Sequence, residues 1–143
     1  MIGKNNFLYV TNEDESEKAS NSYLLSLIAI MTGFPIPLFN LIAAIIFYLG
    51  NKKGTYFVRW HCMQVLLAQT ITFIINLIAV IWVLGILFWN VALTNNFISF
   101  IITAAVFNLI EFVATIYSAI QIRKGLHISW LVIGHLTDMF VKE

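Results

Sequence analysis

The feature that most constrains the fold is a basic passage set between long apolar runs. It extends from Gly50 to Gln64 and contains Lys52, Lys53 and Arg59, whereas the apolar runs on either side carry no charge for many residues. Hydrocarbon accommodates such cations only at a high free-energy cost, so the chain is expected to leave a membrane here. Short basic loops stay on the cytoplasmic side of a membrane, so this passage also predicts the orientation.

The composition supports this interpretation. Sixty per cent of the 143 residues are hydrophobic and 10% are charged, against about a quarter charged in soluble domains. Lipid must therefore cover part of the surface. A net charge of +1 gives no reason to expect nucleic acid as a partner, and the single Cys62 cannot form an internal disulfide. We predict an all-α integral membrane bundle at 23–143, preceded by a polar acidic tail at 1–22.

The first apolar segment, from about Tyr23 to Leu49, is expected to be broken. As one helix it would measure roughly 40 Å, more than the ~30 Å hydrocarbon core of a bilayer. Proline removes a backbone donor and disfavours helix in the residue before it. The expected break lies at Gly33, Pro35 and Pro37. Two half-helices follow, Leu24 to Thr32 and Leu38 to Leu49, either as one kinked span or as a hairpin.

Two full spans are predicted after the basic passage, at about His61–Phe88 and Phe97–Ile122. The loop between them has no charged residue, whereas an Arg-Lys pair follows the second span at position 123. This bias predicts that the loop between the spans is external and that the 50–60 loop and the C-terminus are cytoplasmic. The expected location is the bacterial inner membrane.

The C-terminal segment from His127 to Val141 is too short to span comfortably. Its apolar residues recur at three- and four-residue spacing, which predicts an amphipathic helix. We expect this helix to lie along the cytoplasmic interface. A last helix packed against the bundle is the alternative.

Polar residues inside the apolar runs form a predicted intramembrane seam. Glu111 is the charged residue deep within such a run, and residues one helical turn apart accompany it on both predicted spans. The expected members are Asn40, Gln69, Thr72, Asn76, Asn108, Glu111 and Thr115. We expect Glu111 to be protonated or bonded to Asn76 or Asn40, and favour a role in holding helices together over a proton or solute path.

Neither an enzyme nor a metal site is indicated by the sequence. It contains no H-E-x-x-H, G-x-S-x-G, Walker or dinucleotide-binding pattern. His61 and Gln64 open the predicted second span, where they can bond lipid headgroups or the adjacent loop. We therefore expect a non-enzymatic protein without a cofactor, in contact with the bilayer and with a protein partner or further copies of itself.

The centre of the chain resembles a known family. Phe39-Asn40, the apolar stretch ending in Phe47-Tyr48-Leu49, and the run from Tyr56 to Leu67 resemble the channel subunit of the chloroplast inner-envelope protein-import (Tic) translocon and its small bacterial relatives. The matching motif positions, with one departure at Val65, are Arg59, His61 and Gln64. The proline-broken first segment and Gly125 are also similar to the bacterial relatives.

This resemblance, which covers roughly Tyr23 to the C-terminus, implies a helical membrane protein that moves or assembles other proteins. The compact first segment departs from the two full spans that precede the motif in the chloroplast proteins. On this basis the expected function is an import- or translocation-type component or an accessory subunit of a larger complex. The alternative is a small proton-linked transporter or channel centred on Glu111.

Overall fold

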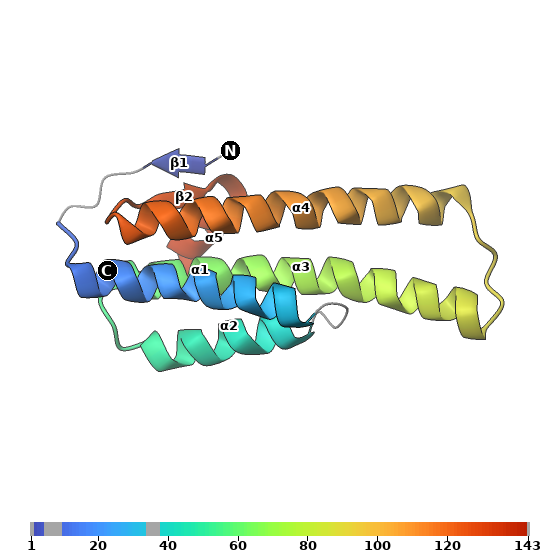
Figure 1. The fold of residues 1–143 in the computed structure, drawn as a ribbon, viewed down its shortest axis with the longest axis horizontal. Coiled ribbons are helices and arrows are strands. Elements are labelled where there is room, and N and C mark those ends of the chain that lie inside the picture. Colours follow the sequence, from blue (N-terminus) through green and yellow to red (C-terminus); the bar gives the residue numbers. More distant parts are fainter. Residues whose placement is uncertain (1, 5–9, 34–37, 143) are drawn as a thin grey trace.

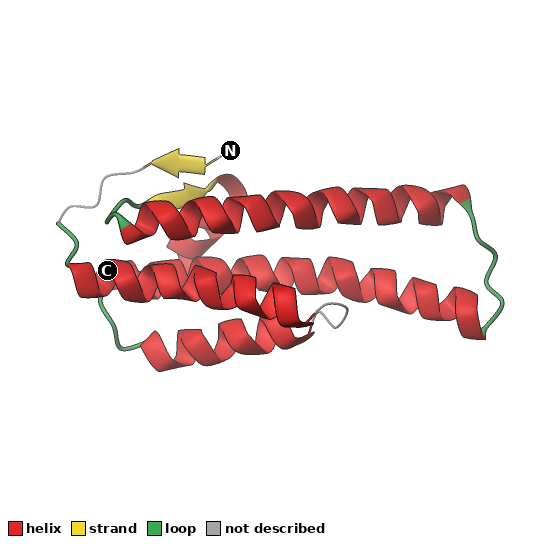
Figure 2. Cartoon of the chain, in the orientation of Figure 1, coloured by secondary structure: helices red, strands yellow, loops and turns green. Residues whose placement is uncertain are grey.

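The computed structural model describes residues 2–4, 10–33 and 38–142. Helices dominate the described chain, which confirms the all-α prediction, and two three-residue strands are added to them (Figures 1 and 2). In chain order the elements are β1 (Ile2–Lys4), α1 (Glu13–Gly33), α2 (Leu38–Asn51), α3 (Tyr56–Phe88), α4 (Asn95–Arg123), β2 (Ile128–Trp130) and α5 (Leu131–Phe140).

Helix α1 begins eleven residues before the predicted half-helix at Leu24, within the acidic stretch of the predicted tail. Asn12 closes its N-terminus, because the Asn12 side chain accepts from the Asp14 amide at 3.2 Å and the Glu15 carboxylate accepts from the Asn12 amide at 3.0 Å. This reciprocal pair is a capping box, and the acidic first turn also complements the helix dipole. The predicted boundary between an N-terminal tail (1–22) and the membrane bundle (23–143) stays a prediction. Residues 13–22 of that tail are helical.

The first apolar segment forms two helices rather than one kinked span. Helix α1 ends at Gly33, α2 starts at Leu38, and the two helices pack side by side as a hairpin (Figure 1). Pro35 and Pro37 lie outside the described residues, so their part in the break stays a prediction.

Helices α3 and α4 are the long elements of the molecule, and α1 and α2 accompany only part of their length (Figure 1). Helix α1 packs against both long helices, whereas α2 packs against α3 and α1. Most buried residues of α3 lie between Phe57 and Thr72. We call the end that holds α1, α2, β2 and α5 the proximal half, and 73–88 of α3 with 95–110 of α4 the distal half.

The C-terminal segment differs from the predicted single helix. Residues 128–130 form β2, which pairs antiparallel with β1 in the register Gly3↔Ser129, and α5 starts only at Leu131. Helix α5 packs against α3, and its buried residues are Gly134 and Thr137. Four large apolar side chains of α5 are 64–71% exposed, namely Leu131, Val132, Met139 and Phe140. Helix α5 therefore packs against the bundle and leaves an apolar face open, and its place at the membrane interface stays a prediction.

Candidate functional site

Five side chains with polar groups form one buried cluster in the proximal half. We call Tyr23, His61, Gln64, His127 and Trp130 the proximal polar cluster; each is at most 9% exposed. They come from α1, α3, the turn after α4, and β2. The sequence allowed His61 and Gln64 to bond lipid headgroups or the adjacent loop, but both side chains are fully buried, so neither reaches the headgroups. Their partners lie far away in sequence, so no local pattern could reveal the cluster.

Gln64 joins three parts of the chain through its side-chain amide. Its Nε2 donates to the Tyr23 hydroxyl at 2.7 Å and to the Ile128 carbonyl at 3.1 Å, and its Oε1 accepts from the Trp130 amide at 3.1 Å. Residues 128 and 130 direct their backbone groups to the same edge of a strand. The Gln64 amide therefore occupies one edge of β2 as a neighbouring strand would, and β1 occupies the other edge.

Two histidines continue the cluster. The Tyr23 hydroxyl lies 3.1 Å from His61 Nδ1, and His61 Nε2 lies 3.2 Å from His127 Nδ1. Phe57 and Trp60 pack their rings edge-on against His61, and the Trp60 and His127 ring centres are 4.3 Å apart. Burial lowers the pKa of His127 from 6.5 to about 4, although the nearby Asp138 carboxylate acts in the opposite direction.

The predicted basic residues lie at the proximal end. Lys52 and Lys53 are exposed between α2 and α3, and Arg59 donates from Nη2 to the Lys142 carbonyl at 3.2 Å. Arg123 lies 3.5 Å from the Glu17 carboxylate, in a half-exposed pair that contributes little to stability. The cations surround the proximal end, and the motif residues His61 and Gln64 point into the bundle beneath them.

The predicted seam between α3 and α4 is partly assembled. Gln69 Nε2 donates to Glu111 Oε1 at 2.6 Å, and the Thr115 hydroxyl lies 3.4 Å from the same oxygen. Glu111 is thus bonded to Gln69, and the predicted partners were wrong. Asn76 and Asn108 instead form a reciprocal amide pair, with both hydrogen bonds at 2.9 Å.

Two other predicted seam residues are less well connected. Thr72 Oγ1 and Asn40 Oδ1 are buried, and neither has a hydrogen-bond partner among the described residues. Gly33, predicted as part of the helix break, is the last residue of α1. The seam therefore consists of a carboxyl–amide contact and an amide pair rather than one continuous polar stripe.

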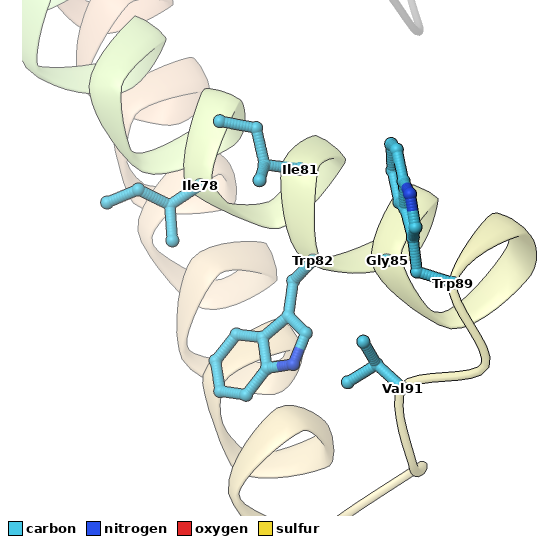
Figure 3. A pocket seen from close by; sticks show the side chains of 6 residues that line it. All are labelled: Ile78, Ile81, Trp82, Gly85, Trp89 and Val91. Carbon is cyan, nitrogen blue, oxygen red and sulfur yellow. The ribbon is translucent and has the colours of Figure 1, made fainter.

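The distal half carries an apolar pocket of about 480 Å³ at the end of α3. Figure 3 shows its lining by Ile78, Ile81, Trp82, Gly85, Trp89 and Val91. The pocket forms where the chain leaves α3, because the Trp89 and Val91 amides both donate to the Gly85 carbonyl, at 3.0 and 3.2 Å. Trp82 also packs against Phe97 and Phe100 of α4. This aromatic group fits the interfacial belt of a membrane.

A comparison with protein families assigns the chain. A model of the magnetosome magnetite crystal formation protein family (MamF/MmsF) matches residues 18–137, which extend from α1 into α5. The chain belongs to that family. Neither the curated proteins nor the solved structures contain a match to it.

Membership of the magnetosome family corrects two predictions. The resemblance to the Tic import channel was wrong, and with it the expected role in protein import or translocation, because the family match concerns magnetite formation. The alternative of a transporter centred on Glu111 is set aside on the same finding. The resemblance rested on Arg59, His61 and Gln64, and two of these serve the packing of the proximal half.

The magnetosome family and the helices together make this chain a membrane protein that contacts lipid. The most apolar windows of α3 and α4 have mean hydropathies of 2.7 and 2.1, and only 6% and 11% of their residues are buried. A core helix of a soluble protein would be mostly buried instead.

Proposed function

We propose that this chain is a non-enzymatic integral protein of the magnetosome membrane that takes part in forming the magnetite crystal. The supporting observation is the family match over residues 18–137. The matched range includes both long apolar helices and all five residues of the proximal polar cluster, whereas β1 lies outside it. The role is thus assigned to the folded membrane domain as a whole rather than to one tail or loop.

The proposed orientation places the proximal end in the cytoplasm. The start of α1, the end of α2, the start of α3 and the end of α4 all lie at this end (Figure 1). Its exposed cations include Lys52, Lys53 and Lys124, and short basic segments stay cytoplasmic. Helices α3 and α4 then cross the membrane, α1 and α2 form a re-entrant hairpin, and both termini are cytoplasmic. Helix α5 rests at the interface with its apolar face toward lipid.

In this orientation the short connection from Trp89 to Thr94 faces the enclosed crystal. It contains neither carboxylate nor imidazole, the side chains that ordinarily bind iron. The protein therefore acts on crystal formation from within the membrane, through its packing with a protein partner or with further copies, rather than by binding the mineral through this loop.

The function is tested by deleting the gene in magnetosome-producing cells and measuring crystal size and number by electron microscopy. Loss of the protein is expected to reduce crystal size or number, and the full-length chain is expected to restore both. Unchanged crystals in the deletion strain would contradict the proposed function. Restoration by a chain whose loop residues 90–94 are replaced with Gly and Ser would support action from within the membrane.

The orientation has its own test. The chain has one cysteine, Cys62, and it is buried, so an introduced cysteine is readily distinguished. Lys53→Cys is expected to react with a membrane-impermeant maleimide only from the cytoplasmic side, and Asn90→Cys only from the opposite side. Labelling of both positions from the same side would contradict the crossing of the membrane by α3.

A further inference from the structure

A chain of hydrogen bonds links the interior of the proximal half to its C-terminal segment. It runs from Gln64 Nε2 to the Tyr23 hydroxyl, then to His61 Nδ1, and from His61 Nε2 to His127 Nδ1, at 2.7, 3.1 and 3.2 Å. Residues 127–141, which contain His127, β2 and α5, are called the C-terminal unit here. The chain of hydrogen bonds therefore reaches the first residue of that unit.

The positions of the protons follow from the donors and acceptors available. The Gln64 amide donates to the Tyr23 oxygen, so the one phenol proton can be directed at His61 Nδ1. His61 then carries its proton on Nε2 and donates it to an unprotonated His127 Nδ1. Both imidazoles are neutral in this arrangement, and a single hydrogen lies between them.

One additional proton is poorly accommodated by this network. With His61 protonated on Nε2, protonation of His127 at Nδ1 would place two N–H groups face to face across 3.2 Å. Protonation of His61 at Nδ1 would turn the Tyr23 hydroxyl away from its acceptor. In either case a buried positive charge would be created beside the rings of Phe57 and Trp60.

The charged and titratable neighbours do not remove this conflict. Tyr23 contacts His61 from α1, Cys62 follows His61 on α3, and the Asp138 carboxylate of α5 acts on His127. Asp138 Oδ1 already accepts from Trp60 Nε1 at 2.7 Å. Its charge raises the pKa of His127, but burial outweighs it and leaves that pKa at about 4.

The same cluster holds the rest of the C-terminal unit. Gln64 binds Ile128 and Trp130, and the Trp130 indole donates to Ser118 of α4 at 2.8 Å. Ile128 follows His127 directly, and Gln64 Nε2 is shared between Tyr23 and the Ile128 carbonyl. A displaced His127 ring therefore disturbs the contacts that hold β2. Release also separates α5 from α3 and uncovers the face of α5 that holds Gly134 and Thr137.

We infer that the C-terminal unit is an acid-released cap on the cytoplasmic end of the bundle, held closed by the neutral His61–His127 contact. The sign follows from linkage: a group with a lowered pKa in the closed state binds protons more readily in the open state. Closure is complete above pH 6.5, the ordinary pKa of histidine, and weakens as the pH falls toward 4. The inference does not depend on the proposed role in magnetite formation.

Hydrogen exchange of the full chain in neutral detergent micelles tests this cap. After correction for the intrinsic rate, amides of 128–140 are expected to exchange roughly ten- to a hundredfold faster at pH 4.5 than at pH 7.5. Amides of α4 between Ala104 and Ser118 should change little. Uniform acceleration along all helices would indicate general acid unfolding and would overturn the inference, as would no acceleration in 128–140.

Variants separate this switch from simple packing. His127→Asn places an acceptor oxygen near the position of Nδ1 but does not titrate, so the acid response is expected to disappear. The exposed His135→Asn is the matched control and should respond as the wild type does. A response that persists in His127→Asn contradicts the inference.

A second variant covers the case in which His127→Asn leaves the unit open even at pH 7.5. Tyr23→Phe removes the hydroxyl that occupies His61 Nδ1, and that nitrogen can then accept a proton more easily. The midpoint of opening is therefore expected to move to higher pH. An unmoved or lower midpoint would contradict the proton arrangement.

Discussion

The two halves of this molecule use polar groups in opposite ways. In the proximal half, side chains from α1, α3, β2 and the turn after α4 form a network in which Gln64 alone makes three hydrogen bonds. In the distal half, two long apolar helices share the Asn76–Asn108 pair and the packing of Trp82 on Phe97 and Phe100, and they direct many large apolar side chains outward. The proximal half is therefore organised like the interior of a soluble protein, and the distal half like a lipid-facing hairpin.

This difference shows where specificity arises in a small membrane protein. Lipid supplies no hydrophobic drive for helix association, so apolar side chains of the distal half do not select partners. Buried backbone groups of β2 must be satisfied, and only particular side chains can satisfy them. We expect substitutions to be costly in the proximal half and mild in the distal half, as the following variants test by unfolding in detergent.

The largest effect is expected for Gln64→Leu. The variant keeps the volume but leaves the Ile128 carbonyl and the Trp130 amide without their buried partner, which should cost roughly 2–5 kcal/mol of unfolding free energy. The half-buried Gln121 of α4 offers a matched control, with Gln121→Leu expected to change stability by less than about 0.5 kcal/mol. If Gln64→Leu and Gln121→Leu lowered the unfolding free energy equally, the hydrogen bonds of Gln64 would contribute nothing specific to stability.

Glycine substitutions sharpen the comparison within the proximal half. A Cβ at Gly134 of α5 would overlap the Ser129 hydroxyl and lie 3.1 Å from Ser129 Cβ, so Gly134→Ala should destabilise by about 1–3 kcal/mol. A Cβ at Gly50 of α2 meets nothing within 4 Å, so Gly50→Ala should stabilise by up to about 1 kcal/mol. A neutral or stabilising effect of Gly134→Ala would show that α5 does not pack closely against Ser129.

Glu111 lies at the boundary between the two halves, and its variants test a structural role. Glu111→Leu leaves the Gln69 amide without its acceptor, and should cost about 1 kcal/mol. Glu111→Gln retains an acceptor oxygen and should cost less than about 0.5 kcal/mol. If Glu111→Gln proved as costly as Glu111→Leu, the negative charge itself would be needed. A role of Glu111 in holding the helices together through its hydrogen bond to Gln69 would then not explain the result.

The smallest effect is expected from the distal amide pair. Asn76→Leu and Asn108→Leu are each expected to cost about 0.6 kcal/mol, the average for a hydrogen bond between membrane helices. The double variant should cost less than the sum, because the second change removes a partner that is already lost. Strict additivity would show that the pair does not couple α3 to α4.

Much of the fold could be predicted because it follows from local solvent preference. The basic passage at 50–64 and the uncharged runs around it indicated two long spans, and the structure has α3 and α4 at those places. The start of α1 was set too late because its first turns are polar and were assigned to a solvated tail. The strand at 128–130 was missed, since its three residues also fit the apolar period of a helix.

The candidate site was less predictable than the fold. Gln69, Asn76, Asn108 and Glu111 follow helical spacing, and their assembly between α3 and α4 was expected in outline. Which of them pair was not, because a one-turn change of register between two helices exchanges every partner. The motif resemblance failed for a related reason: three matched positions at the start of a span do not specify what those side chains contact.

The sequence by itself determined that this chain is built from apolar helices interrupted by a basic turn, because hydrocarbon and water sort residues according to their own chemistry. Tertiary structure alone decided that Tyr23, His61, Gln64 and His127 meet, since hydrogen bonds between residues 38 to 66 positions apart depend on how the helices pack. Local polarity is encoded residue by residue, whereas the choice of partner belongs to the packed bundle.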